Sequence, residues 1–438
     1  MKCLILAAGR GRRLSCRAEA KPLCPLLGLP LIHRAILTAQ RAGATEFYVV
    51  LGHRAQEVRD YLQGLDLPLK VIINQDWHKG ENGLSVLRAR EYLRGQTFLL
   101  LMADHVLEPA LPQRLLAEGL KGADVALAVD TALENPLVDV PDATKVRLRD
   151  SWVADIGKGL GAYDGYDTGV FLCSEALFDA LGQCVKEGRT ALTDAVRLLA
   201  QKGRVRAVKT AGLLWVDVDS PQALKKAEGA LLRALREKPT DGPVARHFNR
   251  PLSVRLSRVL VRTPITPNQL SLLCFLLSGL AALLMAMPGH LALALGGLLA
   301  QAASVLDGSD GEVARLKLLE SEYGAWFDAV LDRYSDGLLL LGLTWHAWGQ
   351  AQQGTALLWG FGAVMGSFAL SYTADKYDQF IRRRLSERGR PPLRLGRDLR
   401  VFLIALGAVA NQALAALVLL AVLMNGEVLR RLLLLRAR

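Results

Sequence analysis

Four aspartates lie in a segment flanked by apolar stretches long enough to cross a membrane, and they constrain this chain more than any other feature. Asp307 and Asp310 are three residues apart, and Asp328 and Asp332 are four apart. Either spacing places both carboxylates on one face of a helix. Isolated charges are costly within a membrane, and four facing carboxylates repel one another unless cations lie between them. We therefore expect two divalent ions there, which would clamp a diphosphate; the alternative is solvated aspartates at a membrane edge.

Long apolar blocks dominate the chain from about residue 265 onward. A membrane-crossing helix needs ~20 mostly apolar residues. The loops predicted on one side lack Lys and Arg, whereas 382–400 holds eight arginines against Glu387 and Asp398. This asymmetry predicts a multi-pass protein of the cell (inner) membrane with the aspartates at the cytosolic face. We expect an all-α domain of six spans, near 268–287, 290–312, 325–347, 354–377, 398–410 and 412–434.

A segment rich in Pro and Gly, residues 236–251, separates this half from a less apolar first half. Basic and apolar residues then alternate through 246–262, which predicts an amphipathic helix on the membrane surface; a solvated helix is the alternative. We therefore divide the chain into a cytosolic domain (1–235), a linker with a surface helix (236–262) and a membrane domain (263–438).

The first half begins with a short apolar run and then turns at Gly9 and Gly11. A strand followed by a glycine-rich loop lets backbone N–H groups approach phosphate oxygens. Arg13 and Lys21 could pair with a triphosphate. The glycines alone are a weak signal, because the loop matches neither GxGxxG nor a Walker A sequence, and an ordinary tight turn remains open.

Strands and helices alternate downstream, which predicts a Rossmann-like α/β domain with a βαβ sheet. The strand at 97–106 ends near Asp104, and a further short strand carries Asp217 and Asp219. Ligand groups gather at the carboxyl ends of parallel strands. The three carboxylates could hold one Mg²⁺, although each could equally cap a turn.

The formal net charge is +12, which fits nucleic acid, anionic lipid or phosphorylated substrates as partners. Aromatic residues make up 6% of the chain. There is no aromatic-rich basic strand on which bases would stack, and much of the basic charge flanks the apolar blocks. Membrane lipids are therefore expected as partners, and nucleic acid is not.

Residues 1–230 resemble the nucleotidyltransferase family that joins a sugar or alcohol phosphate to a nucleoside triphosphate. The segments that carry the resemblance are LAAGRGRRL (6–14), KPL (21–23), GENGLS (80–85), the aspartate of MADH, DTG (167–169) and WVDVD (215–219). The resemblance implies attack of a substrate phosphate on the α-phosphorus, with Arg13 and Lys21 as catalytic cations and Mg²⁺ on Asp104, Asp217 and Asp219. It also implies nucleotide contacts from Ala7, Ala8, Gly9, Gly11, Asn82, Gly83 and Ser85.

The aspartate segment reads D-x-x-D-G-x-x-A-R-x8-G-x3-D-x3-D and resembles the signature of the CDP-alcohol phosphotransferase family at every fixed position. The resemblance covers about 245–438 and implies a six-helix membrane enzyme, usually a homodimer. Asp332 would be the general base on the acceptor hydroxyl and would lie near the second metal. The other implied residues are the metal ligands Asp307, Asp310 and Asp328, and Gly311, Ala314, Arg315 and Gly324 of the CDP pocket.

A phosphorylated acceptor needs a second cationic site. Arg397 and Arg400 lie at the start of the fifth predicted span, and Lys376 lies near the end of the fourth. Arginine suits bidentate binding of phosphate. Contact with anionic lipid is the rival interpretation of these three residues.

Along nearly its full length the chain resembles a fused family, the bifunctional inositol-1-phosphate cytidylyltransferase and di-myo-inositol-1,3'-phosphate-1'-phosphate synthase. That resemblance implies CTP and inositol 1-phosphate as substrates, CDP-inositol as the shared intermediate, and Mg²⁺ that Mn²⁺ could replace. Lys145, Lys158 and Asp167 are candidates for binding the inositol phosphate. Nothing in the sequence identifies inositol directly, so another alcohol phosphate, or a lipid acceptor in the second step, remains open.

Overall fold

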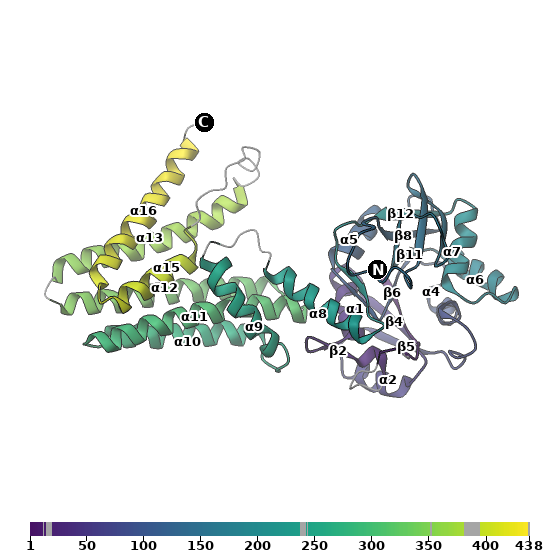
Figure 1. Ribbon diagram of the computed structural model, residues 1–438, viewed down its shortest axis with the longest axis horizontal. Coiled ribbons are helices and arrows are strands. Elements are labelled where there is room, and N and C mark those ends of the chain that lie inside the picture. The colour runs from purple at the N-terminus through teal and green to yellow at the C-terminus, as the bar shows by residue number, and fades with distance from the viewer. Residues whose placement is uncertain are drawn as a thin grey trace. The chain divides into compact units, whose positions relative to one another are not determined.

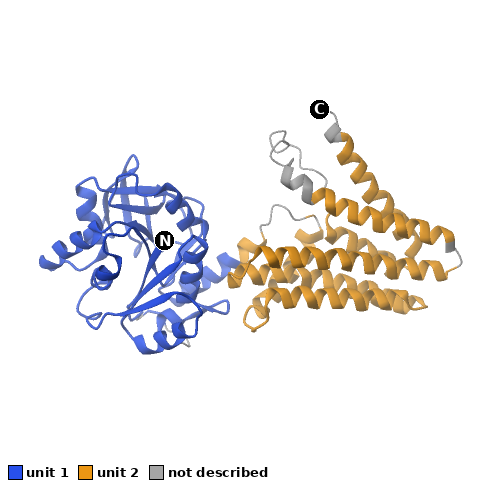
Figure 2. Cartoon of the chain, turned by 180° about the vertical axis from the view of Figure 1, so that it is seen from behind, with its two compact units in different colours: residues 1–231 blue, residues 232–438 orange. Residues whose placement is uncertain are grey.

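The chain forms two compact units, residues 1–231 and 232–438 (Figure 2). The computed structural model describes residues 1–11, 13–14, 20–236, 242, 244–350, 353–380 and 395–436. The boundary between the units falls inside helix α8 (Pro221–Arg236). Most of the predicted linker, 237–241 and 243, and most of the arginine-rich stretch, 381–394, lie outside the described residues.

A nine-stranded sheet forms the centre of the first unit, in the order β5-β4-β1-β6-β11-β8-β12-β10-β9 (Figure 1). Two small two-stranded sheets, β13-β7 and β2-β3, accompany it. The strands are β1 Lys2–Ala7, β2 Pro25–Leu26, β3 Leu29–Pro30, β4 Glu46–Leu51, β5 Leu69–Ile73, β6 Phe98–Met102, β7 His105–Leu107, β8 Val125–Asp130, β9 Lys145–Arg149, β10 Trp152–Gly157, β11 Gly165–Cys173, β12 Val205–Lys209 and β13 Trp215–Asp217.

Helices cover both faces of this sheet, because its strands are apolar on both sides. Leu4 and Leu6 of β1 pack in the core that contains residues of α6 and α7. Cys3 and Ile5, the alternate residues of the same strand, pack in the core that contains residues of α1 and α5. The remaining helical segments are η1 Lys21–Leu23, α1 Leu31–Arg41, α2 Ala55–Gln63, α3 Asn82–Leu87, α4 Arg90–Leu93, α5 Ala110–Glu118, α6 Ala176–Lys186 and α7 Leu192–Gln201.

The predicted βαβ sheet is present in one half, where β5, β4, β1 and β6 are parallel. The other half differs, because β11 runs antiparallel to both β6 and β8. The connection from β10 to β11, residues 158–164, contains no helix. Strand β11 does not pair with β10 but runs antiparallel to the start of β9, so its direction follows from its pairing with β6, β8 and β9.

The second unit is helical, with a helix at each of the six predicted spans. Helices α10, α11, α13 and α16 are long and apolar enough to cross a membrane. Helix α12 carries several charges and α15 is 13 residues long, so these two remain predicted spans. The segments are η2 Ala245–Asn249, α9 Arg250–Leu260, α10 Pro267–Ala286, α11 His290–Lys317, α12 Glu322–Gly349, α13 Gln353–Phe380, α15 Arg397–Val409 and α16 Ala413–Arg436.

Small residues let these helices pack closely. Thr266 and Gln269 form a capping box that starts α10, which then lies against α11 and α12 (Figure 1). At Gly342 in α12, an added Cβ would lie 2.4 Å from the carbonyl oxygen of Ala282 in α10. Such close backbone approach is typical of helices packed in membranes.

Gly342→Ala should therefore push α10 and α12 apart and lower the stability of the second unit by about 1–3 kcal/mol, as overpacking typically does. Thermal unfolding in detergent measures the effect. Gly279→Ala is the matched control, because no heavy atom lies within 4 Å of its added Cβ. Equal melting temperatures for the two variants would contradict this view of the contact.

Candidate active sites

Three potential metal ligands meet where two short strands pair in the first unit. Asp104 lies between β6 and β7, and β7 pairs with β13 so that His105 is opposite Asp217. One ligand atom from each of these three residues lies within 4.8 Å of the other two. The structure thus brings together two of the three predicted carboxylates, with an imidazole beside them.

Gly169 makes room for this imidazole. Its φ is +75°, and an added Cβ would lie 2.4 Å from His105 Nδ1. The same ring nitrogen is 2.8 Å from the carbonyl oxygen of Thr168, which fixes the orientation of the ring. The glycine of the DTG segment is therefore needed for both its backbone conformation and its lack of a side chain.

Lys21 lies against this cluster. Its Nζ is 2.5 Å from Asp104 Oδ2, and its side chain packs on Gly11, where a Cβ would lie 2.5 Å from Lys21 Cδ. Burial opposes ionisation of Asp104, but the charges of Lys21 and His105 outweigh it and lower the pKa of that carboxyl. Burial likewise opposes protonation of His105, and the charges of Asp217 and Asp104 outweigh it and raise the pKa. The site therefore favours the ionised forms of Asp104 and His105, whereas burial raises the pKa of Asp217.

A cavity of about 310 Å³ opens beside the cluster. Asp142, in the loop after β8, bridges two cations there: its carboxylate is 2.6 Å from Arg13 and 2.5 Å from Lys158. Those hydrogen bonds lower its pKa. Arg13 also lies 2.6 Å from Asp219, which lines the cavity outside the three-residue cluster. Asp142 therefore holds the two cations that the sequence assigns to phosphates.

Of the other predicted nucleotide and sugar-phosphate residues of this unit, some line the cavity and others do not. Asn82 and Asp167 line the cavity. Ser85 is buried and accepts a hydrogen bond from Asn74, so it supports the loop from inside. Lys145 lies over the ring of Tyr163 and does not line this cavity. Of the rest, Gly83 packs on Thr190, Ala7 and Ala8 are buried, and Gly9 has open space around it.

Asp142→Asn should raise the affinity for pyrophosphate about threefold to fivefold, because the phosphate no longer competes with a carboxylate for Arg13 and Lys158. Exposed ion pairs are each worth about 0.2–1 kcal/mol. Calorimetric titration of both proteins measures the change. Asp139→Asn is the control, because Asp139 also lines the cavity. A rise of the same size in both variants would show that only general charge repulsion had been relieved.

Asp167 gives the first unit a pH-dependent stability. Burial raises its pKa to about 6, although Gly169 N–H donates a hydrogen bond to it. Because the pKa of Asp167 is raised in the folded state, the contribution of this side chain to the free energy of unfolding is complete below the ordinary pKa of 3.8. That contribution is lost as the pH rises through about 6. Asp167→Asn should therefore stabilise the protein at pH 7.5 by on the order of 1–3 kcal/mol relative to pH 5. Calorimetric melting at both pH values tests this; equal effects at both would refute it.

The second site lies where α11 and α12 face each other. Carboxylate oxygens of Asp307, Asp328 and Asp332 all lie within 4.8 Å of one another. Asp310 is turned toward α10, where it accepts a hydrogen bond from Ser271 Oγ. It also accepts one from the backbone N–H of Gly311 in its own helix. Three of the four predicted aspartates are thus in position to share an ion, and Asp310 is held by other partners.

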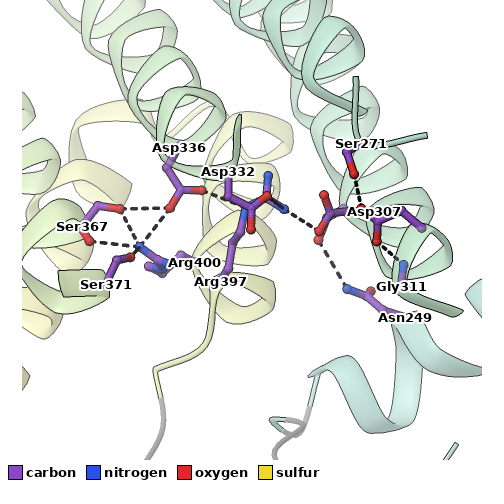
Figure 3. Close-up of polar contacts among 12 residues, drawn as sticks. Asn249, Ser271, Asp307, Gly311, Asp332, Asp336, Ser367, Ser371, Arg397 and Arg400 are labelled. Carbon is purple, nitrogen blue, oxygen red and sulfur yellow. Dashed lines mark hydrogen bonds and ion pairs between the residues drawn. The ribbon is translucent and has the colours of Figure 1, made fainter. Parts of the chain in front are cut away.

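Arg397 lies between this group and a fifth aspartate, Asp336 (Figure 3). Its Nη1 is 2.7 Å from Asp307 and 2.9 Å from Asp332, and its Nε is 3.0 Å from Asp336. Arg400 Nη1 lies 3.0 Å from Asp336 and donates a 2.5 Å hydrogen bond to Ser367 Oγ. The two predicted acceptor-phosphate arginines are therefore anchored on α12 and α13.

The remaining predicted residues of this site lie around its edge. An added Cβ at Gly324 would be 3.2 Å from Asn268 Oδ1, and at Gly311 it would be 3.6 Å from Arg315. Ala314 is buried in the same turn of α11. The side chain of Lys376 lies outside the described part of the chain.

Glu312 ties the predicted surface helix to the helix that carries Asp307. It is fully buried, and its carboxylate lies 2.7 Å from Arg250 and accepts hydrogen bonds from Ser253 and Ser257 of α9. The face of α9 away from this contact exposes Phe248 of η2 together with Leu252, Leu256 and Val259. This arrangement fits a helix whose apolar side meets lipid.

Five residues that the structure places in these sites are not among those predicted from the sequence. Two had local signals: His105 directly follows Asp104, and Asp336 continues the four-residue spacing of Asp328 and Asp332. The others, Asp142, Glu312 and Ser367, acquire their partners only through tertiary packing.

Two family models match separate parts of the chain: a MobA-like NTP transferase domain over residues 3–197 and a CDP-alcohol phosphatidyltransferase over residues 264–426. With the four apolar helices, the second match indicates association with a membrane. Both families generally use divalent metals, which fits the two carboxylate groups.

Curated relatives match the chain from end to end. A protein of Rubrobacter xylanophilus named bifunctional IPC transferase and DIPP synthase is 41% identical over 99% of this chain and 96% of its own length. One of the same name from Aquifex aeolicus is 33% identical over 97% and 96%. Among solved structures, the inositol-1-phosphate CTP transferase from T. maritima is 21% identical and covers 52% of this chain and 96% of its own, with a TM-score of 0.46.

Proposed function

Since this chain belongs to the family of bifunctional IPC transferases and DIPP synthases, we propose that its two units catalyse consecutive reactions of inositol 1-phosphate. In the first, CTP and inositol 1-phosphate give CDP-inositol and pyrophosphate. In the second, CDP-inositol and another inositol 1-phosphate give a phosphorylated di-inositol phosphodiester and CMP. The observation that carries the proposal is the end-to-end match, joined to two separate groups of carboxylates and cations, one in each unit.

In the first unit, a phosphate oxygen of inositol 1-phosphate attacks the α-phosphorus of CTP, and pyrophosphate leaves. Arg13 and Lys158 bind phosphate oxygens once Asp142 releases them. Lys21 balances the charge that develops during transfer, and it is held in place by Gly11 and Asp104. This arrangement supplies positioning and electrostatic stabilisation, which account for most of the catalysis of phosphoryl transfer.

One Mg²⁺ fits the first unit, because carboxylate oxygens of Asp104 and Asp217 lie close together. Asp219 lines the same cavity. Two divalent ions fit the second unit on Asp307, Asp310, Asp328 and Asp332, and Mn²⁺ could replace Mg²⁺ in either unit. When bound, such ions neutralise diphosphate charge.

In the second unit, Asp332 accepts the proton of the acceptor hydroxyl, and the resulting alkoxide attacks the β-phosphorus of CDP-inositol while CMP leaves. Arg397 and Arg400 bind the phosphate of the acceptor. Gly311, Ala314, Arg315 and Gly324 shape the pocket for CDP. A phosphorylated acceptor is favoured because both arginines are held by Asp336 in the interior of the helical unit.

We further propose a multi-pass protein of the inner membrane that forms a homodimer through residues 263–438, with both sites on the cytoplasmic side. Residues 1–235 form the cytidylyltransferase and residues 236–262 the linker and surface helix. The exposed apolar face of α9 supports contact with lipid.

The test supplies purified protein in detergent with CTP, Mg²⁺ and a panel of alcohol phosphates, and measures release of pyrophosphate and then of CMP. Inositol 1-phosphate should support both. The specific assignment fails if another alcohol phosphate supports both steps and inositol 1-phosphate supports neither.

Single substitutions separate the two sites. Asp332→Asn should reduce CMP release by at least about 100-fold, the usual scale for loss of a general base, and leave pyrophosphate release intact. Asp104→Asn should do the reverse when CDP-inositol is supplied. Loss of both activities in either variant would argue against two independent sites.

A further inference from the structure

Asp336 lies outside the aspartate signature and yet contacts both arginines at the start of α15. It is buried, and Ser367 of α13 donates a 3.1 Å hydrogen bond to its Oδ2. Contacts from two helices therefore fix this carboxylate. Buried charges are retained only where such partners compensate them.

Arg397 holds Asp336 and the signature aspartates with different nitrogens. Nε contacts Asp336, whereas Nη1 contacts Asp307 and Asp332 (Figure 3). The planar guanidinium turns as one unit about the Cδ–Nε bond, and this rotation can move Nη1 while Nε stays near its partner. The guanidinium has one fixed contact and one exchangeable contact.

The exchangeable contact uses oxygens that a metal ion would need. Asp307 and Asp332 belong to the group whose ligand atoms lie within 4.8 Å of one another. A carboxylate oxygen that accepts from a guanidinium is a poorer ligand for a cation, and two cations so close repel each other. Arg397 and a divalent ion therefore compete at this point.

We propose that Asp336 is a positioning residue that draws Arg397 away from the metal-ligand carboxylates and toward the acceptor phosphate. Binding of a divalent ion displaces Nη1 from Asp307 and Asp332, and the anchor on Asp336 keeps the released group beside Arg400. Arg400 Nε is buried and has no hydrogen-bond partner among the described residues, so it retains a donor for an anion. Metal and acceptor phosphate thus strengthen each other's binding. The identity of the acceptor rests on the proposed function, whereas the competition between Arg397 and a divalent ion does not.

A double-mutant cycle on the full chain in detergent tests this. Mn²⁺ affinity is measured by electron paramagnetic resonance in an Asp104→Asn, Asp217→Asn background, which silences the first unit's cluster. Arg397→Gln should tighten Mn²⁺ binding about tenfold. Asp336→Asn should weaken it about fivefold while Arg397 is present and less than twofold in the Arg397→Gln protein. The same factor in both backgrounds would mean that Asp336 acts only through its own charge, and would overturn the proposal.

Ser367→Ala gives a milder test that leaves every charge in place and is suited to the case in which Asp336→Asn does not fold. This variant should weaken Mn²⁺ binding about twofold when Arg397 is present, and it should have no effect in the Arg397→Gln protein. The positioning role is contradicted if Ser367→Ala has no effect on Mn²⁺ binding when Arg397 is present, or if its effect persists in the Arg397→Gln protein. When Asp104 and Asp217 are intact, Asp336→Asn should raise KM for the acceptor at least tenfold. The kcat for CMP release should stay within about threefold of that of the unchanged protein. If the cycle succeeds while inositol 1-phosphate is not a substrate, only the proposed function fails.

Discussion

Negative charge placed between apolar helices is the constraint on which the second unit depends. Asp307, Asp328 and Asp332 lie close enough that their charges must be compensated. Arg397 in the first turn of α15 pairs with Asp307 and Asp332, and Arg400 in the same helix pairs with the neighbouring Asp336. The helix that supplies these cations is the short one, and α12, which supplies Asp328 and Asp332, carries too many charges to count among the apolar spans.

The charged groups of the first unit are arranged differently from those of the second. Its acids and bases lie around an open cavity on a sheet, and they already pair: Lys21 with Asp104, and Arg13 and Lys158 with Asp142. Water can screen the two pairs of Asp142, because Arg13 and Lys158 are mostly exposed, so each of these pairs is weak and can be exchanged for a phosphate at small cost. In the second unit the corresponding pairs are buried, and exchange there requires a partner that keeps the arginine in place.

The sequence predicts most of what depends on local periodicity. A helix lies within about five residues of each predicted span, and Asp307 of α11 lies close to Asp328 and Asp332 of α12. What it does not predict depends on tertiary packing. Ser85 belongs to a predicted binding loop and yet is buried against Asn74, while Asp142 reaches Arg13 from 129 residues away. The antiparallel β11 also has no local signal, because its direction is set by its pairing with β6 and β8, which are distant in the sequence.

Helix α15 has 13 residues. At a rise of 1.5 Å per residue it is about 20 Å long, whereas the hydrocarbon layer of a bilayer is about 30 Å thick. The end of α15 lies level with the start of α11, where His290 Nε2 is 2.8 Å from the carbonyl oxygen of Val409. On the proposed topology, the two guanidinium groups at the other end of α15 therefore lie below the level of the lipid headgroups. A hydroxyl bound beside them would meet fewer competing water molecules than one in bulk solvent, and the shortness of one helix would thereby favour transfer to an alcohol over hydrolysis of the activated donor.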